Sequence, residues 1–312
     1  MQAYTQPVLF LFGAGASAFS GGCLPSAPPI GRDVITTIPW SEKVTAALSD
    51  ELVEAFRDNF EATMVRFYEE SPTAASWMLK DMGLYFLKFQ PTPANHYVKL
   101  LTSLNVPLDR CVLATTNYDL LIEASLSYLG RSYCFPFPTT DGAVCVLKLH
   151  GSCHFLPAVD TSRWHYVELV APYGNSVISS DEENDIRVVT RAEAAMFCRS
   201  TNSIPPAMAI YGPGKPMLTG ANFVTRRLQP RFRSLAASAA AIIVVGLHLN
   251  TADQHIWDPL AASPAPLYYV SRERDLFERW AADVHRGNAE WLCDSFEIAV
   301  NMIPDVLRRL YD

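Results

Sequence analysis

The sequence has no cysteine pair of the C-x-x-C type. Its 312 residues include seven cysteines, scattered as Cys23, Cys111, Cys134, Cys145, Cys153, Cys198 and Cys293. Structural zinc modules need thiolates at short spacing, so no such module and no bound metal are expected. An odd number of dispersed cysteines instead predicts reduced, mostly buried thiols, as in cytoplasmic proteins.

Clusters of positive charge are also missing. The formal net charge is −7, charged residues make up 18% of the chain, and no dense Lys/Arg run occurs. Such a chain has no general attraction to nucleic acid or to an anionic membrane, and we predict direct binding to neither. The 49% hydrophobic content instead predicts a compact fold with a substantial core.

Two uncharged stretches raise the question of targeting or membrane segments. Nothing basic precedes Arg32, so the first stretch lacks the n-region of a secretory signal and is better interpreted as a buried strand. The second stretch, Ser234 to Ala252, contains Gly246, His248 and Asn250. It predicts a helix end followed by a buried strand, not a membrane span. We therefore expect a cytoplasmic protein.

Five apolar runs have the composition of strands covered on both faces. They are Val8–Phe12, Arg110–Ala114, Val144–Leu149, Ala241–Val245 and Leu267–Val270. Helical segments separate them, which predicts an α/β fold with a Rossmann-like, doubly wound parallel sheet. We expect one domain spanning residues 1–312, with its core in 1–40 and 105–312.

Two insertions are expected within that core. In residues 41–104, apolar side chains recur every fourth residue from Val44 to Met64 and predict an amphipathic helix. Further helices are predicted over Thr73–Phe89 and Asn95–Leu104, with their Met and aromatic side chains packed in the core. Residues 155–215 are rich in proline and loops and contain an exposed acidic run at 181–183. They are a candidate lid.

The first strand runs directly into Gly13-Ala14-Gly15-Ala16-Ser17-Ala18, the glycine turn. A strand that ends in such a turn and opens a helix is how parallel α/β sheets bind a phosphate group. Gly13 permits the sharp turn, and Gly15 lets the backbone approach a pyrophosphate. By itself the motif predicts only nucleotide binding of an unspecified kind.

Polar residues follow three other strands, where ligands bind in an open parallel sheet. These segments are Thr115-Thr116-Asn117-Tyr118-Asp119, His150-Gly151-Ser152 and Gly246-Leu247-His248. If the strands are neighbours, Asn117, Asp119 and His150 converge above the glycine turn. The alternative is structural: Thr116 or Asn117 caps the next helix, and His150 and Gly151 serve a turn.

In this order, the glycine turn, Thr116-Asn117-Tyr118-Asp119, Lys148-Leu149-His150-Gly151-Ser152 and Val244-Val245-Gly246 resemble the sirtuin-like NAD-binding fold. The similarity is closest to the bacterial sirtuin-like domains of antiphage defence systems. The segment 28–33, and Gly246 followed by Asp253, His255 and Ile256, also resemble that group. Sirtuin deacylases carry two C-x-x-C pairs and an Asp-Phe-Arg loop, both of which this sequence lacks, so deacylation is disfavoured.

The resemblance implies NAD+ as substrate and hydrolysis of the nicotinamide–ribose bond, yielding nicotinamide and ADP-ribose. It implies that Asn117 positions water or the ribose and that His150 is the general base. The implied binding residues are Gly13, Ala14, Gly15, Ala16, Ser17, Thr116, Asp119, Gly151, Gly246, Leu247 and Asp253. A homo-oligomer and a separate activating partner, such as an ATPase, are expected. A non-catalytic NAD or ADP-ribose sensor, and a transferase or cyclase, remain alternatives.

Other patterns carry less weight. His150 and His154 have the i,i+4 spacing of a zinc-binding helix but lie at a strand end. Gly212–Lys215 is too short for a phosphate loop, and Asp33 follows a Pro/Gly loop where a ribose-binding acid would follow a strand. Asp253 and His255 could reach the adenosine half of the ligand; the alternative, which we favour, is that Thr251 or Asp253 caps the N-terminus of a helix.

Overall fold

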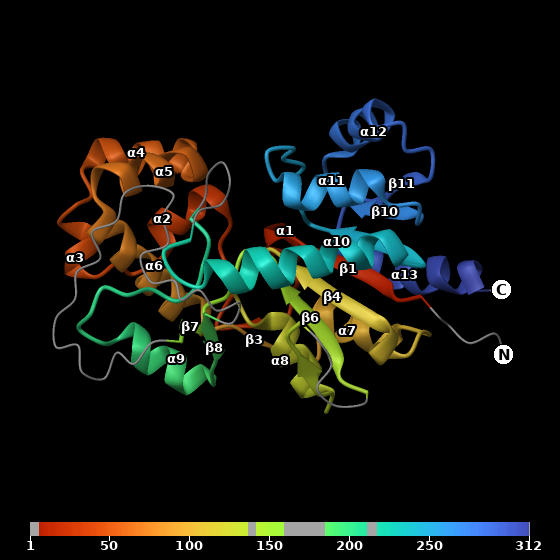
Figure 1. The fold of residues 1–312 in the computed structure, drawn as a ribbon, viewed down its shortest axis with the longest axis horizontal. Helices are drawn as coiled ribbons and strands as arrows, with labels where there is room; N and C mark the ends of the chain where they lie inside the picture. Colours follow the sequence, from red (N-terminus) through yellow and green to blue (C-terminus); the bar gives the residue numbers. More distant parts are fainter. Residues whose placement is uncertain (1–5, 137–141, 159–184, 211–216, 312) are drawn as a thin grey trace.

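The predicted apolar runs all lie in one central sheet (Figure 1), and nearly all of their residues are buried. The structure, a computed structural model, describes residues 6–136, 142–158, 185–210 and 217–311. Seven parallel strands lie in the order β11-β10-β9-β1-β4-β6-β5. They are β1 (Val8–Phe12), β4 (Cys111–Thr115), β5 (Tyr133–Cys134), β6 (Val144–Lys148), β9 (Ala241–Val245), β10 (Leu267–Val270) and β11 (Ala289–Cys293). The predicted Rossmann-like parallel sheet is confirmed.

The five predicted strands all form, within a residue at either end. The sequence missed the two outermost strands, β5 and β11, for physical reasons. β5 is only two residues long. β11 is an edge strand whose first three residues are only partly covered, so it lacks a continuous apolar run.

Helices cover both faces of the sheet, as the alternation of side chains along β1 requires. Val8, Phe10 and Phe12 pack towards α7 (His96–Ser103), α8 (Leu121–Tyr128) and α13 (Phe296–Tyr311). Leu9 and Leu11 pack towards α10 (Gln229–Ser238), α11 (Gln254–Ala262) and α12 (Arg274–Asp283). The predicted helix end and buried strand within 234–252 are the end of α10 and β9.

The helical insertion forms the lobe at the left of Figure 1. This lobe contains α3 (Glu42–Thr45), α4 (Asp50–Asp58), α5 (Phe60–Glu70) and α6 (Pro72–Phe86) of the insertion, together with α2 (Val34–Thr37), which precedes the predicted start of the insertion at residue 41. The single helix predicted from Val44 to Met64 is wrong, because two capping residues interrupt it. The side chain of Ser49 accepts the Leu52 N–H at 3.2 Å, and Asn59 accepts the Ala62 N–H at 3.0 Å. The Met and aromatic side chains are core, as predicted.

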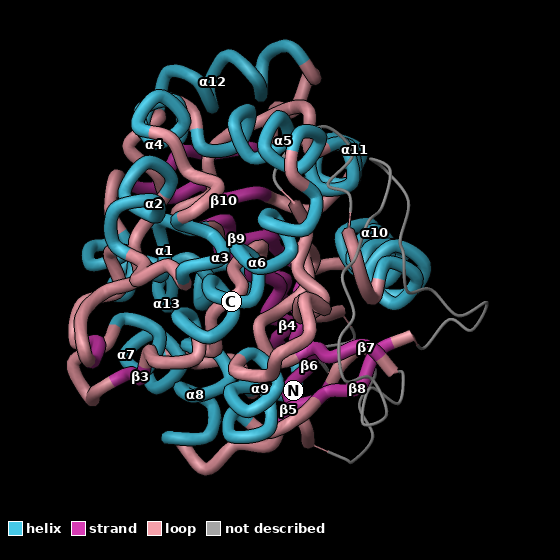
Figure 2. Tube along the Cα trace, turned by 90° about the vertical axis from the view of Figure 1, so that its left-hand side faces the viewer, coloured by secondary structure: helices cyan, strands magenta, loops and turns pink. Residues whose placement is uncertain are grey.

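The remaining elements are short. They are α1 (Ala14–Ala18), η1 (Gly31–Asp33), η2 (Leu108–Arg110), α9 (Arg191–Cys198), the π-helical turn η3 (Phe223–Leu228), and the antiparallel pairs β2 (Cys23–Leu24) with β3 (Gln90–Pro91) and β7 (Phe155–Pro157) with β8 (Ile186–Val188). Figure 2 shows β7 and β8 beside the end of β6. The acidic run 181–183 and residues 212–215 lie outside the described residues. The division into a core and two insertions stays a prediction.

The strand order reverses at β1. From β1 the chain adds β4 and β6 on one side, and then returns to place β9 and β10 on the other. In open parallel sheets the carboxyl ends of the strands at such a reversal leave a crevice for ligands. The topology therefore places the candidate site where the loops after β1 and β9 face each other. Within the described residues, no helix combines the length and apolarity needed to cross a bilayer.

Candidate functional site

The loops after β1 and β9 fit into each other, and their glycines are the reason. A Cβ on Gly13 would lie 2.3 Å from Leu247 Cα, and one on Gly246, whose φ is +62°, would lie 2.2 Å from the Ala16 nitrogen. Gly15 donates its N–H to the Gly246 carbonyl at 2.9 Å. The glycines therefore first serve contact between two turns, and the Gly15 amide is used within the protein.

Asn117 ties the end of β4 to the glycine turn. Its Nδ2 donates to the Gly13 carbonyl at 2.9 Å and to Ser17 Oγ at 2.8 Å. Ser17 Oγ lies 3.1 Å from the buried Tyr97 hydroxyl, and the Asn117 N–H donates to Thr115 Oγ1 at 3.0 Å. The capping alternative for Asn117 therefore does not hold, because its side chain reaches across to another strand end.

Asp119 supports the start of α8, and a buried ion pair supports the segment to which Asp119 belongs. Asp119 Oδ1 accepts the Leu121 N–H at 2.9 Å at the start of α8. Lys148 Nζ donates to the Asp119 carbonyl and lies 3.2 Å from Glu123 Oε1, with both side chains almost fully buried. Burial raises the pKa of Glu123, while the Lys148 charge opposes that rise. Lys148 belongs to the Lys148–Ser152 motif noted in the sequence, but nothing in the sequence predicted that it would pair with Glu123.

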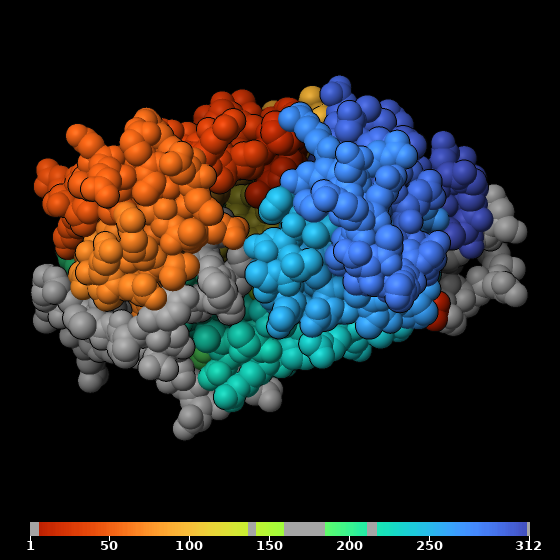
Figure 3. All heavy atoms as spheres, turned by 90° about the horizontal axis from the view of Figure 1, so that it is seen from above, coloured from red at the N-terminus to blue at the C-terminus, as the bar shows by residue number. Residues whose placement is uncertain are grey.

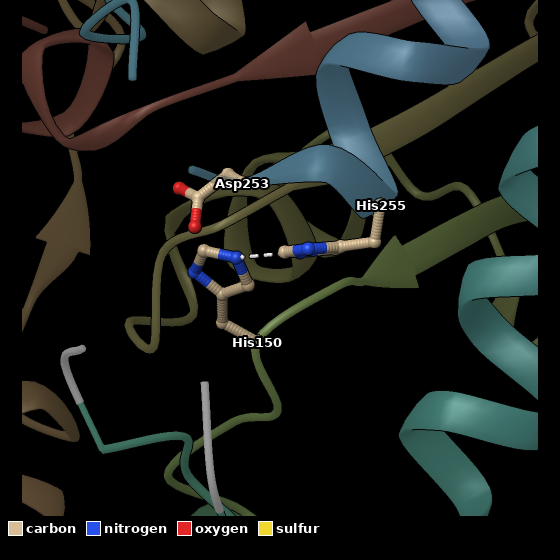
Figure 4. A group of neighbouring side chains, drawn as sticks. All are labelled: His150, Asp253 and His255. Carbon is tan, nitrogen blue, oxygen red and sulfur yellow. Dashed lines mark hydrogen bonds between the residues drawn. The ribbon is translucent and has the colours of Figure 1, made fainter. Parts of the chain in front are cut away.

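His150 meets two residues of the other half of the sheet (Figure 4). The Nε2 atom of His150 lies 2.9 Å from Nε2 of His255, and the Asp253 carboxylate lies beside the His150 ring. One ligand atom from each residue lies within 4.8 Å of the others, a grouping that suits a metal ion. Asp253 stands at the N-cap of α11 yet makes no side-chain capping hydrogen bond there. This juxtaposition was not predicted, because β1 and β4 separate β6 from β9.

His150 and Asp253, but not His255, are among the residues that line an inner cavity of about 110 Å³. Figure 3 shows the hollow between the helical insertion and the C-terminal half of the chain. Asn117, Asp119, His150 and Asp253 line it, together with Ala14, Ser17, Thr116 and Leu247. Glu61 and Phe86 of the helical insertion complete its wall. Among the residues that the structure describes, its lining contains the carboxylates of Glu61, Asp119 and Asp253 and no Lys or Arg side chain.

An outer cavity of about 940 Å³ adjoins the inner one and shares part of its lining. Ala14, Gly15, Gly246 and Leu247 form its floor. Its volume falls within the range of small-molecule sites, about 300–1,000 Å³. Arg32 and Arg272 line it beside several carboxylates, and Asp33 lies on its wall.

The structure thus brings most of the predicted residues together. Gly13, Ala16 and Gly151 are not among the residues that line either cavity. Gly151 has a structural reason to be glycine: its φ is +79°, and a Cβ there would lie 2.0 Å from the Ala207 carbonyl oxygen. That finding agrees with the turn that the alternative interpretation assigned to it.

Sequence reasoning assigned no role to several lining residues, although His248 stands in one of the polar segments that follow a strand. His248 Nδ1 lies 2.6 Å from Glu273 Oε1 at the edge of both cavities. Phe19 packs under Arg272, with the guanidinium carbon 4.7 Å from the ring centroid. Phe19 directly follows the glycine turn and Arg272 lies just after β10, but neither belongs to a motif identified in the sequence. Only the fold brings them to it.

His154 is separate from the site, in line with the low weight given to its i,i+4 spacing. It is buried against Phe135 and Phe155, and its Nδ1 lies 2.8 Å from Ser152 Oγ. Burial lowers its pKa to about 3, so the imidazole is neutral. The partner of His150 is His255 and not His154.

No family model and no curated protein matches the chain. Solved structures do. A Sir2 homologue in complex with NAD aligns with 97% of this chain and 89% of its own length, at a TM-score of 0.50 and 15% identity. A Sir2 enzyme aligns at a TM-score of 0.47 and 17% sequence identity. A single-residue variant of a Sir2 homologue in complex with ADP-ribose aligns at a TM-score of 0.45 and 14% sequence identity. The fold assignment rests on the first of these: the chain has a sirtuin-like, Rossmann-like α/β fold.

Proposed function

We propose that this protein is an NAD+ glycohydrolase that cleaves the nicotinamide–ribose bond of NAD+ to nicotinamide and ADP-ribose. One observation carries the proposal: Asn117 and His150 face an acidic inner cavity that opens beside the glycine turn into a larger outer one. The nicotinamide ring of NAD+ is cationic. A cavity whose described lining contains carboxylates and neither Lys nor Arg favours that charge. The outer cavity, with Arg32 and Arg272, takes the diphosphate and adenosine.

The chemistry needs few groups. Nicotinamide is a good leaving group, so the site must chiefly stabilise an oxocarbenium-like centre and place a nucleophile. Asp119 and Glu61 supply negative charge around that centre, while Asn117 offers its side-chain oxygen to water or to a ribose hydroxyl. His150 accepts the proton of the attacking water. No metal takes part in these steps.

The binding residues follow the cavities. Thr116, Asp119 and Asp253 contact the nicotinamide side, and Ala14, Gly15, Ser17 and Leu247 contact the ribose and diphosphate. Gly13, Ala16, Gly151 and Gly246 act through the shape of the backbone. The closure of Gly246 onto Ala16 makes this shape rigid.

Release of nicotinamide from NAD+ by the purified protein tests the proposal. Asn117→Ala and His150→Ala should each lower the rate at least a hundredfold, because positioning and general-base catalysis each contribute about 10²–10⁴. His285→Asn is the control, since His285 is exposed and is not among the lining residues of either cavity. Unchanged melting temperatures and retained ADP-ribose binding would separate lost chemistry from lost folding. Release unaffected by both alanine variants refutes the assignment.

The biological role we propose is depletion of cytoplasmic NAD+ during phage infection. Constant activity would be toxic, so we expect gating by homo-oligomerisation or by a separate partner such as an ATPase. The assay is therefore run with the protein alone and with any co-encoded partner. A fall in cellular NAD+ on infection, abolished by His150→Ala, supports the role.

Two alternatives are separated by product and binding measurements. A sensor or assembly subunit would bind NAD+ or ADP-ribose in calorimetry but show no turnover under any activating condition. A transferase or cyclase would release nicotinamide without free linear ADP-ribose, which mass spectrometry of the products distinguishes.

A further inference from the structure

The structure assigns to His150, Asp253 and His255 a binding site for a divalent transition-metal ion, of which Zn²⁺ is the best fit, in the wall of the inner cavity. The histidine Nε2 atoms lie 2.9 Å apart, and the carboxylate completes a group within 4.8 Å. The side chains come from two segments more than 100 residues apart, the end of β6 and the start of α11.

The donor set matches the chemistry of zinc. Two imidazole nitrogens and one carboxylate are a ligand set that zinc enzymes use, with a fourth position left open. Tetrahedral Zn²⁺ with bonds of about 2.0–2.1 Å holds its ligand atoms about 3.3 Å apart. The two nitrogens therefore need to separate by only a few tenths of an ångström, and the carboxylate needs to close in.

Two features of the surroundings favour a cation. The inner cavity carries the further carboxylates of Glu61 and Asp119, and no Lys or Arg side chain lines it in the part of the chain that the structure describes. Asp253 stands at the N-cap of α11, and its carboxylate points towards the His150 ring (Figure 4). The open coordination position would face the cavity, where water can complete the shell.

A bound ion changes what His150 can do. Zn²⁺ would occupy Nε2, replacing the proton shared between the two imidazoles, and that nitrogen could no longer accept a proton from water. If His150 is the general base, which rests on the proposed function, the ion is an inhibitor of NAD+ cleavage. The site would then keep the enzyme silent while Zn²⁺ is bound.

Metal binding is tested without any activity assay. The purified protein, stripped of metal with a chelator, is titrated with Zn²⁺ in a calorimeter and with Co²⁺ in a spectrophotometer. We expect one ion per chain, and for Co²⁺ the intense visible absorption of four-coordinate sites without thiolate charge-transfer bands. His255→Gln and Asp253→Asn should each weaken binding at least tenfold, with the fold checked by circular dichroism. His248→Gln, which changes a histidine in the same cavity but outside the cluster, should not.

The result that overturns the site is no saturable binding, or binding that His255→Gln and Asp253→Asn leave unchanged. Thiolate bands that disappear in Cys23→Ser would place the ion on a cysteine and overturn it as well. A second experiment measures nicotinamide release against Zn²⁺: inhibition should weaken at least tenfold in His255→Gln. If the protein binds Zn²⁺ but cleaves no NAD+, the proposed function fails while the metal site stands.

Discussion

The buried Lys148–Glu123 pair gives the sharpest test of how this site is held together. Its atoms are 3.2 Å apart, and the side chains are 1% and 3% exposed. At an effective dielectric constant of about 20, that separation corresponds to about 5 kcal/mol of attraction. Desolvation offsets much of this attraction in the intact protein, but removal of one partner leaves the other charge buried. We therefore expect Lys148→Met to lower the free energy of unfolding by about 3–5 kcal/mol.

The lost hydrogen bond adds a local consequence. Lys148 Nζ donates to the Asp119 carbonyl, so the variant also frees the segment that carries Asn117 and Asp119. Replacing both charges in Lys148→Met/Glu123→Leu removes the uncompensated carboxylate. The double variant should recover most of the stability, short of about 1–3 kcal/mol for the unsatisfied carbonyl.

The direction in which the stability of Lys148→Met changes with pH distinguishes an uncompensated buried charge from a simple loss of packing. In Lys148→Met the pKa of Glu123 rises further above its unfolded value near 4.5, because desolvation is no longer opposed. A carboxyl with a raised folded pKa contributes stability below the unfolded pKa and loses it as pH rises through the folded pKa. The deficit of the variant should therefore shrink as pH falls from 7 to 4.5.

Urea unfolding followed by circular dichroism and tryptophan fluorescence measures all three variants, the third being Glu123→Leu. The reasoning is refuted if Lys148→Met costs less than about 1 kcal/mol, or if the double variant is no more stable than Lys148→Met. A deficit that stays constant between pH 7 and 4.5 would assign the loss to packing.

Three further predictions concern the scaffold, each read from urea unfolding. Gly246→Ala should lower the free energy of unfolding by more than about 3 kcal/mol, because its Cβ would lie 2.2 Å from the Ala16 nitrogen. The control, Gly130→Ala, has a similar φ but no neighbour within 4 Å of its Cβ and should lower it by about 1 kcal/mol. Equal losses would contradict the close contact between the two turns. Asn59→Ala, which removes the N-cap of α5, should cost about 1 kcal/mol, and Asn59→Asp should restore it. Burial raises the pKa of the Cys111 thiol from 9.0 to about 12, so the stability that this thiol contributes is lost above pH 9. Between pH 8 and 10 the free energy of unfolding of the wild type should fall by about 1.4 kcal/mol relative to that of Cys111→Ala. Parallel curves of stability against pH for the two proteins would argue against this.

The outcome for the helical insertion shows what periodicity can and cannot predict. The side chains at the four-residue spacing from Val44 to Met64 are buried, apart from Leu48, which is partly buried. It could not show the breaks at Ser49 and Asn59, because a capping residue and a mid-helix polar residue look alike when only apolar spacing is counted. The burial of a residue followed from its pattern, while the helix boundaries depended on single hydrogen bonds.

By itself, the sequence determined the class of fold, the two-faced burial of the central strands and the strand ends that carry polar residues. Those are local properties: composition, alternation and the residue types that follow a strand. The tertiary structure decided which strand ends meet. Because the strand order reverses at β1, the turns of Gly13 and Gly246 contact each other. For the same reason His150 lies beside His255 and Asp253, and not beside His154, which is nearer in the sequence. Contacts between segments more than 100 residues apart depend on strand order and register, which no local pattern encodes.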